Sequence, residues 1–156
     1  MDFDKIKREK YLTQYPTVKG KLSEFCDSLY DELLTSGYSL LLDDVQNIVL
    51  QEVRFLAGWC RLDCQHSDDE PPIGGFSSFT IDLDTVLLAD EWVIIEQAVR
   101  SHCDLVQARR MEGSQALGVT PFGISSSEAL QNHIQARETM KREAFHHAPF
   151  SVEYDD

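Results

Sequence analysis

Long apolar runs are missing from this 156-residue chain: the longest are short segments such as Leu40–Leu42 and Val86–Ala89. Because a membrane-spanning helix needs about 20 consecutive apolar residues, we expect no such segment. The N-terminal residues carry charge without an apolar stretch behind them, which is not the pattern of a secretory signal. The sequence therefore predicts a protein of an aqueous, reducing compartment with no membrane partner.

Basic residues are scarce. Fourteen Lys and Arg face 27 Asp and Glu, which gives a net charge of −13. A surface this negative repels phosphate, so the balance argues against a sequence-reading DNA binder and against a protein of anionic membranes. Residues 1–22 hold six basic and three acidic groups, a net +3, so that the other 134 residues carry −16. The basic segment is typical of an interaction arm or of a solvated N-terminus.

Catalytic motifs are also missing. The sequence has no G-x-x-x-x-G-K-[ST] phosphate loop, no G-x-G-x-x-G after a strand, no G-x-S-x-G nucleophile elbow and no EF-hand loop. We therefore expect a protein that is not an enzyme, with no catalytic residues, no cofactor and no resident metal.

Cysteine is sparse, and its four positions leave two interpretations open: Cys26, Cys60, Cys64 and Cys103. The spacing Cys60-x3-Cys64-x-His66 indicates a zinc-binding module, to which His102-Cys103 could add ligands. Three of the cysteines instead fall on apolar stripes of expected helices, where a free thiol behaves as a small buried hydrophobe. We favour the second interpretation, in which the cysteines are apolar residues of the helical core.

The first two expected helices follow apolar stripes with steps of three and four residues. One stripe runs from Val18 to Leu33, with Thr17 as N-cap and Gly37 as the stop. A second contains Val45, Val49, Val53, Leu56 and Cys60, with Asp43 or Asp44 as its cap, and fades near Leu62.

Two further helices are expected in the second half. The third carries Trp92, Ile95, Val99, Cys103, Val106 and Arg110; it begins at Asp84 or Asp90 and ends before Gly118 and Pro121. The fourth opens with a capping box, Ser125-Ser126-Ser127-Glu128, and ends at Phe145. Its apolar face is thin (Leu130, Ile134, Met140, Ala144), so we expect it on the outside of the bundle or against a partner.

The fold class that follows is mainly α: one domain over residues 1–147, a small bundle of about four helices. Residues 1–16 form a polar N-terminal arm, and residues 63–83 form a projecting loop or short β-hairpin. Phe79, Ile81 and Leu83 alternate with polar residues as in a strand. Phe76, Phe79 and Ile81 are candidate partner-docking residues, because a loop this long is typically functional.

Arg109 and Arg110 lie late on the third helix, and Arg110 falls on its apolar stripe. A guanidinium on a buried stripe needs an acceptor. Glu138 and Glu143 of the fourth helix are the candidates, either as an interhelix ion pair or as a contact between subunits.

One resemblance extends over roughly residues 80–152. It rests on Asp90-Glu91-Trp92, on the run Val99–Leu105 with Gln107–Gly113, on Leu117-Gly118-Val119, on Phe122-Gly123 with Ser125–Ala129, and on Met140–Phe145 followed by Ala148–Val152. These segments resemble the core helix and flanking turns of tailed-bacteriophage head–tail connector proteins, also called adaptor or head-completion proteins.

The resemblance implies a structural virion protein at the head–tail junction, present in the host cytoplasm during assembly. It implies a homo-oligomeric, dodecameric ring that binds the portal protein and tail or neck proteins, while DNA passes through the lumen without sequence-specific binding. Residues 148–156 would be an extended C-terminal docking tail. There Phe150, Val152 and Tyr154 alternate with polar residues after Pro149, a pattern suited to strand addition and also compatible with a frayed acidic end.

Two other functions stay open. The acidic balance favours a small cytoplasmic regulator that mimics DNA or binds a basic host protein. The spacing of Cys60, Cys64 and His66 favours a zinc-binding module.

Overall fold

A computed structural model describes residues 18–65, 80–115, 117–118 and 123–146. The predicted N-terminal arm of residues 1–16, the docking candidates Phe76 and Phe79, the possible zinc ligand His66 and the whole predicted tail of residues 148–156 lie outside these ranges.

The chain is mainly helical, as the sequence predicts. The described residues contain four α-helices: α2 (Leu22–Thr35), α3 (Leu42–Ala57), α4 (Ala89–Gln115) and α5 (Ser126–His146). A short 3₁₀ turn, η1 (Asp63–Gln65), follows α3, and two short strands are β1 (Lys19–Lys21) and β2 (Val86–Leu88). Within the described ranges, no helix is long and apolar enough to cross a membrane.

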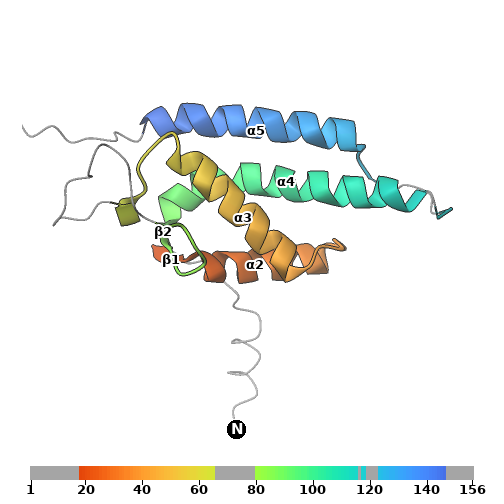
Figure 1. Cartoon of the computed structure of the whole chain (residues 1–156), viewed down its shortest axis with the longest axis horizontal. Coiled ribbons are helices and arrows are strands. Elements are labelled where there is room, and N and C mark those ends of the chain that lie inside the picture. Colours follow the sequence, from red (N-terminus) through yellow and green to blue (C-terminus); the bar gives the residue numbers. More distant parts are fainter. Residues whose placement is uncertain (1–17, 66–79, 116, 119–122, 147–156) are drawn as a thin grey trace, which may run out of the picture.

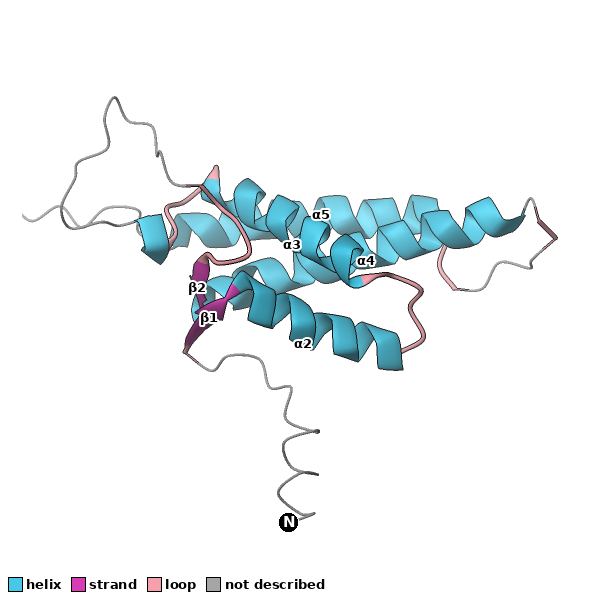
Figure 2. Ribbon diagram, turned by 60° about the horizontal axis from the view of Figure 1, so that its bottom comes forward, coloured by secondary structure: helices cyan, strands magenta, loops and turns pink. Residues whose placement is uncertain are grey.

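The helices pack as a layered bundle (Figure 1). α4 and α5 run side by side along most of their length, α3 crosses α4, and α2 lies on the side of the bundle away from α5. The second view keeps this order and shows the strand pair at one end of α2 (Figure 2). α4 therefore has helices on both sides, which explains why its sequence carries more than one buried face.

The strand pair changes the start of the first helix. Thr17 was predicted to cap a helix, but β1 pairs antiparallel with β2, with Gly20 opposite Leu87, and α2 begins only at Leu22. The first free amide of α2 donates to the Thr85 carbonyl at 2.9 Å, so a distant segment caps the helix. Sequence periodicity could not predict this cap, because it depends on a contact across more than sixty residues.

The end of α2 is the one predicted at Gly37. Gly37 has φ +86°, in the left-handed region that favours glycine. The Gly37 amide donates to the Leu34 carbonyl at 3.2 Å and the Tyr38 amide to the Leu33 carbonyl at 3.1 Å. These two bonds form a Schellman motif, which stops the helix and turns the chain toward α3.

α3 has the predicted core stripe but different ends. Asp44 does not occupy the N-cap: it lies in the first turn, where its carboxylate accepts from the Leu41 amide at 2.8 Å. The helix stops at Ala57, so Cys60 lies beyond it and not on its stripe. Gly58 follows directly, and a residue without a side chain is a weak helix former.

The start of α4 is stabilised by Glu91 in its first turn. This carboxylate accepts from the Leu88 amide at 2.9 Å and from the Asp63 amide of η1 at 2.7 Å. Burial raises the pKa of Glu91 above its ordinary value, an effect that these backbone bonds only partly offset. Glu91 thus joins the start of α4 to the segment after α3.

One of the two bonds of the predicted capping box of α5 is present, and a second contact joins it. The Glu128 amide donates to Ser125 Oγ at 3.2 Å, while the Ser126 amide and hydroxyl both donate to the Glu112 carboxylate of α4 at 2.6 Å. The start of α5 is therefore fixed on α4.

The residues predicted to form one apolar face of α5 belong to two different faces of that helix. The face that packs on the bundle is fully buried and follows a strict helical spacing: Ala129, His133, Ala136, Met140 and Ala144. Leu130 and Ile134 are exposed. Three of the five buried residues are alanines, which let the α5 backbone approach α4 closely.

The segment before β2 is not the strand predicted from Phe79, Ile81 and Leu83. Residues 80–85 form no strand, and Thr85 accepts from the Asp82 amide at 2.9 Å in a local turn. Ile81 is only 9% exposed and belongs to the main core. This end of the predicted projecting loop therefore packs on the bundle, where the Leu83 and Thr85 carbonyls accept from the first amides of α2 and the Ile81 carbonyl accepts from Arg54 of α3.

Candidate functional site

The predicted ion pairs of the two arginines are not the ones that form. Arg110 lies at an exposed edge of α4 and pairs with Asp44 of α3 at 2.8 Å, and it also donates to the Ser39 carbonyl at 3.2 Å. Glu138 pairs with Lys141 of its own helix at 2.7 Å. Arg109 and Glu143 are exposed. Arg110 does make an interhelix ion pair, but to α3 rather than to α5, because its side chain lies toward the α2–α3 connection.

Ile81 does not suit its predicted docking role, because its buried side chain already contacts this chain's own core. The four cysteines are free thiols, with Cys26 and Cys103 buried and Cys60 and Cys64 half-buried. Burial raises the pKa of Cys26 and of Cys103 to about 12, which keeps both thiols protonated and unreactive.

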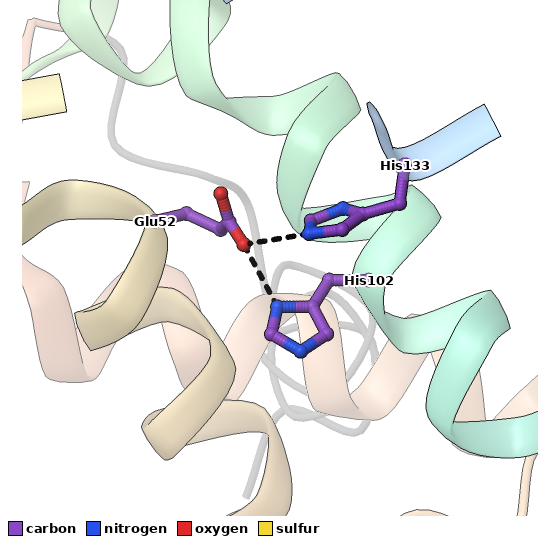
Figure 3. A group of neighbouring side chains, drawn as sticks. All are labelled: Glu52, His102 and His133. Carbon is purple, nitrogen blue, oxygen red and sulfur yellow. Dashed lines mark hydrogen bonds and ion pairs between the residues drawn. The ribbon is translucent and has the colours of Figure 1, made fainter. Parts of the chain in front are cut away.

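A buried polar cluster lies instead between α3, α4 and α5. Its centre is Glu52, a charged residue on the core face of α3, between Val49 and Leu56, where its side chain is fully buried. His102 comes from α4, and His133 and Arg137 come from successive turns of α5. Figure 3 shows both imidazole rings directed at the Glu52 carboxylate.

One carboxylate oxygen receives most of the contacts. Glu52 Oε1 lies 2.8 Å from His102 Nδ1, 3.4 Å from His133 Nε2 and 3.0 Å from Arg137 Nη2. Arg137 Nε donates to the other oxygen, Oε2, at 3.0 Å. The guanidinium also stacks on the Phe55 ring at 4.5 Å from its centroid. Glu52 is therefore the hub that joins three helices.

The charge state of the cluster follows from these contacts. Burial on its own would raise the pKa of Glu52, but hydrogen bonds from His102 and Arg137 outweigh it, and the pKa lies below its ordinary 4.5. Burial lowers the pKa of His133 below its ordinary 6.5, which the nearby Glu52 charge only partly opposes. At neutral pH the cluster thus holds an ionised Glu52, a charged Arg137 and a neutral His133.

The far side of the His133 ring is fixed by a serine. His133 Nδ1 lies 3.2 Å from Ser101 Oγ, and Ser101 Oγ lies 3.0 Å from the Ala98 carbonyl oxygen. A serine hydroxyl has one hydrogen, which either of these two groups can accept. Two tautomers of neutral His133 fit these contacts: Nδ1–H donates to Ser101 Oγ, or Ser101 donates to Nδ1 and His133 Nε2–H donates toward Glu52 Oε1.

This arrangement can do two things chemically. It is a satisfied ion-pair network that sets the position of α5, since in the described residues no fully buried side-chain nitrogen or oxygen lacks a partner. It is also the only group among them with three possible metal-ligand side chains close together, with ligand atoms all within 4.8 Å of one another.

Sequence reasoning missed this cluster, although a signal was present. Glu52 interrupts an apolar stripe at a core position of α3, and His133 interrupts a stripe of alanines. A single charged residue on a buried face needs a partner, so each position indicates a polar contact. What the pattern could not give is that the two positions face one another.

Comparison with protein-family models, with curated proteins and with solved structures finds no match to this chain.

Proposed function

We propose that this chain is a structural assembly protein and, following its sequence resemblance, a head–tail adaptor of a tailed bacteriophage. The observation that carries the structural role is an apolar stripe on the outer side of α5. Leu130, Ile134 and Phe145 are 40%, 53% and 69% exposed there, and Trp59, which contacts Phe145, is 43% exposed. No reaction is assigned to the chain.

The three α5 residues of the stripe lie on one side of the helix, with Lys141 between Ile134 and Phe145. At about 100° per residue, its three α5 positions fall within about 60° of one another, to one side of the buried alanine face. Trp59 contacts Phe145 with ring centroids 6.3 Å apart, and Lys141 Nζ lies 4.8 Å from the Trp59 ring. Aromatic groups with a basic rim are typical of protein-binding surfaces. We call Trp59, Leu130, Ile134 and Phe145 the α5 patch.

A closed ring requires a second, different surface on each subunit, because neighbours meet head to tail. A candidate lies at the start of α4. Val18 and Val93 are 71% and 70% exposed, and the Val18 carbonyl accepts from the Ala89 amide at 2.8 Å, one turn before Val93. In the proposed ring this surface binds the α5 patch of the next subunit.

The family resemblance adds the partners. The ring would join the portal to tail or neck proteins in the virion, after assembly in the host cytoplasm, and DNA would pass through its lumen. The net charge of −13 supports this role, because acidic walls repel DNA and leave it free to move. The predicted tail of residues 148–156 would dock on a neighbouring protein.

The same charge supports a second candidate, a small acidic regulator that binds one basic host protein. This function needs no ring and no portal. Recovery of one basic host enzyme by a tagged chain, with no self-association, would favour it.

Two measurements test the adaptor role. Ile134→Glu places a charge in the α5 patch, whereas Gln135→Glu places the same charge on an exposed position rotated by about 100°. By analytical ultracentrifugation with and without the portal, we expect at least about a tenfold loss of association for the first variant and little change for the second, since a buried unpaired charge is costly. Equal behaviour of the two variants would contradict the patch.

The second measurement is a particle reconstruction by electron microscopy. Density for this chain at the portal–tail junction is expected. Particles that contain the chain elsewhere, or lack it, would overturn the adaptor role even if the α5 patch proves to bind another protein.

A further inference from the structure

We propose that Glu52, His102 and His133 form a binding site for a divalent transition-metal ion, with Zn²⁺ the best-suited ion. The site would hold α3, α4 and α5 together, a role that is independent of the adaptor function. Its ligand atoms are Glu52 Oε1, His102 Nδ1 and His133 Nε2, which all lie within 4.8 Å of one another (Figure 3).

The spacing suits coordination. Zinc binds nitrogen and carboxylate oxygen at about 2.0–2.2 Å, so neighbouring ligands around a tetrahedral ion lie roughly 3.4 Å apart. Glu52 Oε1 is 3.4 Å from His133 Nε2 and 2.8 Å from His102 Nδ1. Lengthening the contact between His102 and Glu52 by about half an ångström brings it to this spacing, and the two ring nitrogens lie within 4.8 Å of one another.

His133 provides the strongest argument. Its Nδ1 lies 3.2 Å from Ser101 Oγ, and in the tautomer with the proton on Nδ1 the Nε2 lone pair is available to a metal ion. His133 Nε2 lies 3.4 Å from Glu52 Oε1, which is the separation of two neighbouring ligand atoms around a tetrahedral ion. A cation between them turns this contact into two coordinate bonds. The Ser101 contact is also the outer hydrogen bond that metal-bound histidines characteristically make.

His102 needs only a change of tautomer. Without metal, its Nδ1–H donates to Glu52 Oε1 at 2.8 Å. On metal binding, Nδ1 becomes the ligand and the proton moves to Nε2 by exchange with water.

Arg137 limits the affinity without blocking the site. Its Nε–Oε2 bond of 3.0 Å and its stacking on Phe55 hold the guanidinium on the far carboxylate oxygen. The metal replaces only the Nη2 contact to Oε1. Because the guanidinium repels a divalent ion a few ångströms away, removing its charge should strengthen binding.

The donor set selects the class of ion. Imidazole nitrogens suit zinc and its neighbours in the first transition row, whereas Mg²⁺ and Ca²⁺ prefer oxygen ligands alone. Two histidines and one carboxylate leave a fourth position for water. The four cysteines are not needed, which separates this site from the one that the spacing of Cys60 and Cys64 suggests.

The test is a titration of the full chain, stripped with EDTA, with ZnCl₂ by calorimetry and with Co²⁺ by visible absorption. We expect a single equivalent of metal, a Co²⁺ spectrum of nitrogen and oxygen ligands without thiolate charge transfer, and a rise in Tm of about 5–10 °C at saturation. His102→Gln with His133→Gln should abolish all three signals, whereas Cys60→Ser with Cys64→Ser should leave them unchanged.

Arg137→Gln tests the site even if the histidine variants fail to fold. It should bind Zn²⁺ at least about tenfold more tightly, a gain that a folding defect cannot produce. No binding by the wild-type chain at a large molar excess, thiolate absorption with Co²⁺, or unchanged binding by the double histidine variant would each overturn the site and leave the cluster as an ion-pair network.

Discussion

The two sides of α4 are built from different chemistry. Toward α2 the contacts are apolar and large: Phe25 stacks on Trp92 with ring centroids 4.7 Å apart, and both residues are buried. Toward α5 the contacts are alanines and a polar hub, with Glu52 fully buried at the centre. An apolar layer fills space and tolerates small sliding, whereas an ion-pair hub has one geometry. We infer that the polar layer fixes the register of α5.

The largest effect is expected in the apolar layer. Phe25→Ala removes a fully buried ring and leaves a cavity beside Trp92, which should lower the free energy of unfolding by about 3–5 kcal/mol. Urea denaturation followed by circular dichroism measures it. Val93→Ala, on the exposed side of α4, is the control and should cost at most about 0.5 kcal/mol. A loss below about 1 kcal/mol for Phe25→Ala would mean that this layer is not the main core.

The next largest effect tests the hub. Glu52→Ala leaves Arg137 and His102 without their acceptor and should cost about 2–4 kcal/mol in EDTA, somewhat less than a fully buried pair because Arg137 is partly exposed. Glu138→Ala, which removes an exposed carboxylate, is the control.

The contact between Glu52 and Arg137 also predicts that the effects of substituting these two residues on the free energy of unfolding are not additive. Glu52→Leu combined with Arg137→Met replaces the pair by apolar groups and should be more stable than Glu52→Leu alone by about 1 kcal/mol or more. Additive losses in this cycle would mean that the two side chains do not depend on one another.

A smaller effect tests the close approach of α4 and α5. Ala136 is 3% exposed on the packed face of α5, so Ala136→Leu should force the helices apart and cost about 1–3 kcal/mol. Gln135→Leu adds the same side chain on the exposed face and should change stability by at most about 0.5 kcal/mol. Equal effects would show that α5 packs loosely.

The smallest effect concerns the exposed pair of Asp44 and Arg110. Asp44→Asn weakens a charged contact and a first-turn hydrogen bond and should cost about 1 kcal/mol at pH 7. The Leu41 backbone bond and Arg110 lower the pKa of Asp44 below its ordinary 3.8, although burial opposes them. This stabilisation is therefore present above pH 3.8 and is lost as the pH falls through the folded-state pKa. Denaturation at pH 7 and near pH 3 measures the difference, and an unchanged gap between the two proteins would contradict the assigned cause.

Much of the apolar layer could be predicted from the sequence. The predicted stripes are buried from Leu22 to Leu33 and from Val45 to Leu56, although Val18 at the start of the first is exposed and Cys60 at the end of the second lies beyond its helix. The stops at Gly37 and Gly118 follow from backbone conformations that favour glycine. The α5 face was predicted less well, because alanine and histidine carry a weak hydrophobic signal and the exposed Leu130 and Ile134 carry a strong one.

The candidate site could not be predicted in the same way. Arg110 was assigned an acceptor on α5, but the acceptor is Asp44 of α3, since the choice between carboxylates depends on how the helices are arranged. Ile81 was assigned to a partner surface, but it covers the core because β2 and β1 pair and bring its segment back to α2.

The features that the sequence determined by itself are local: the presence of helices α2 to α5, most of their ends and the apolar faces of α2 and α3. The faces follow directly from the sequence because helix geometry places residues three or four positions apart on one side. Only the tertiary structure decided which charged side chains meet. Glu52, His102 and His133 are each separated by thirty residues or more, and their approach depends on how α3 crosses α4 and how the alanines of α5 let it pack closely. No periodicity encodes such a meeting, since it depends on three helix orientations at once.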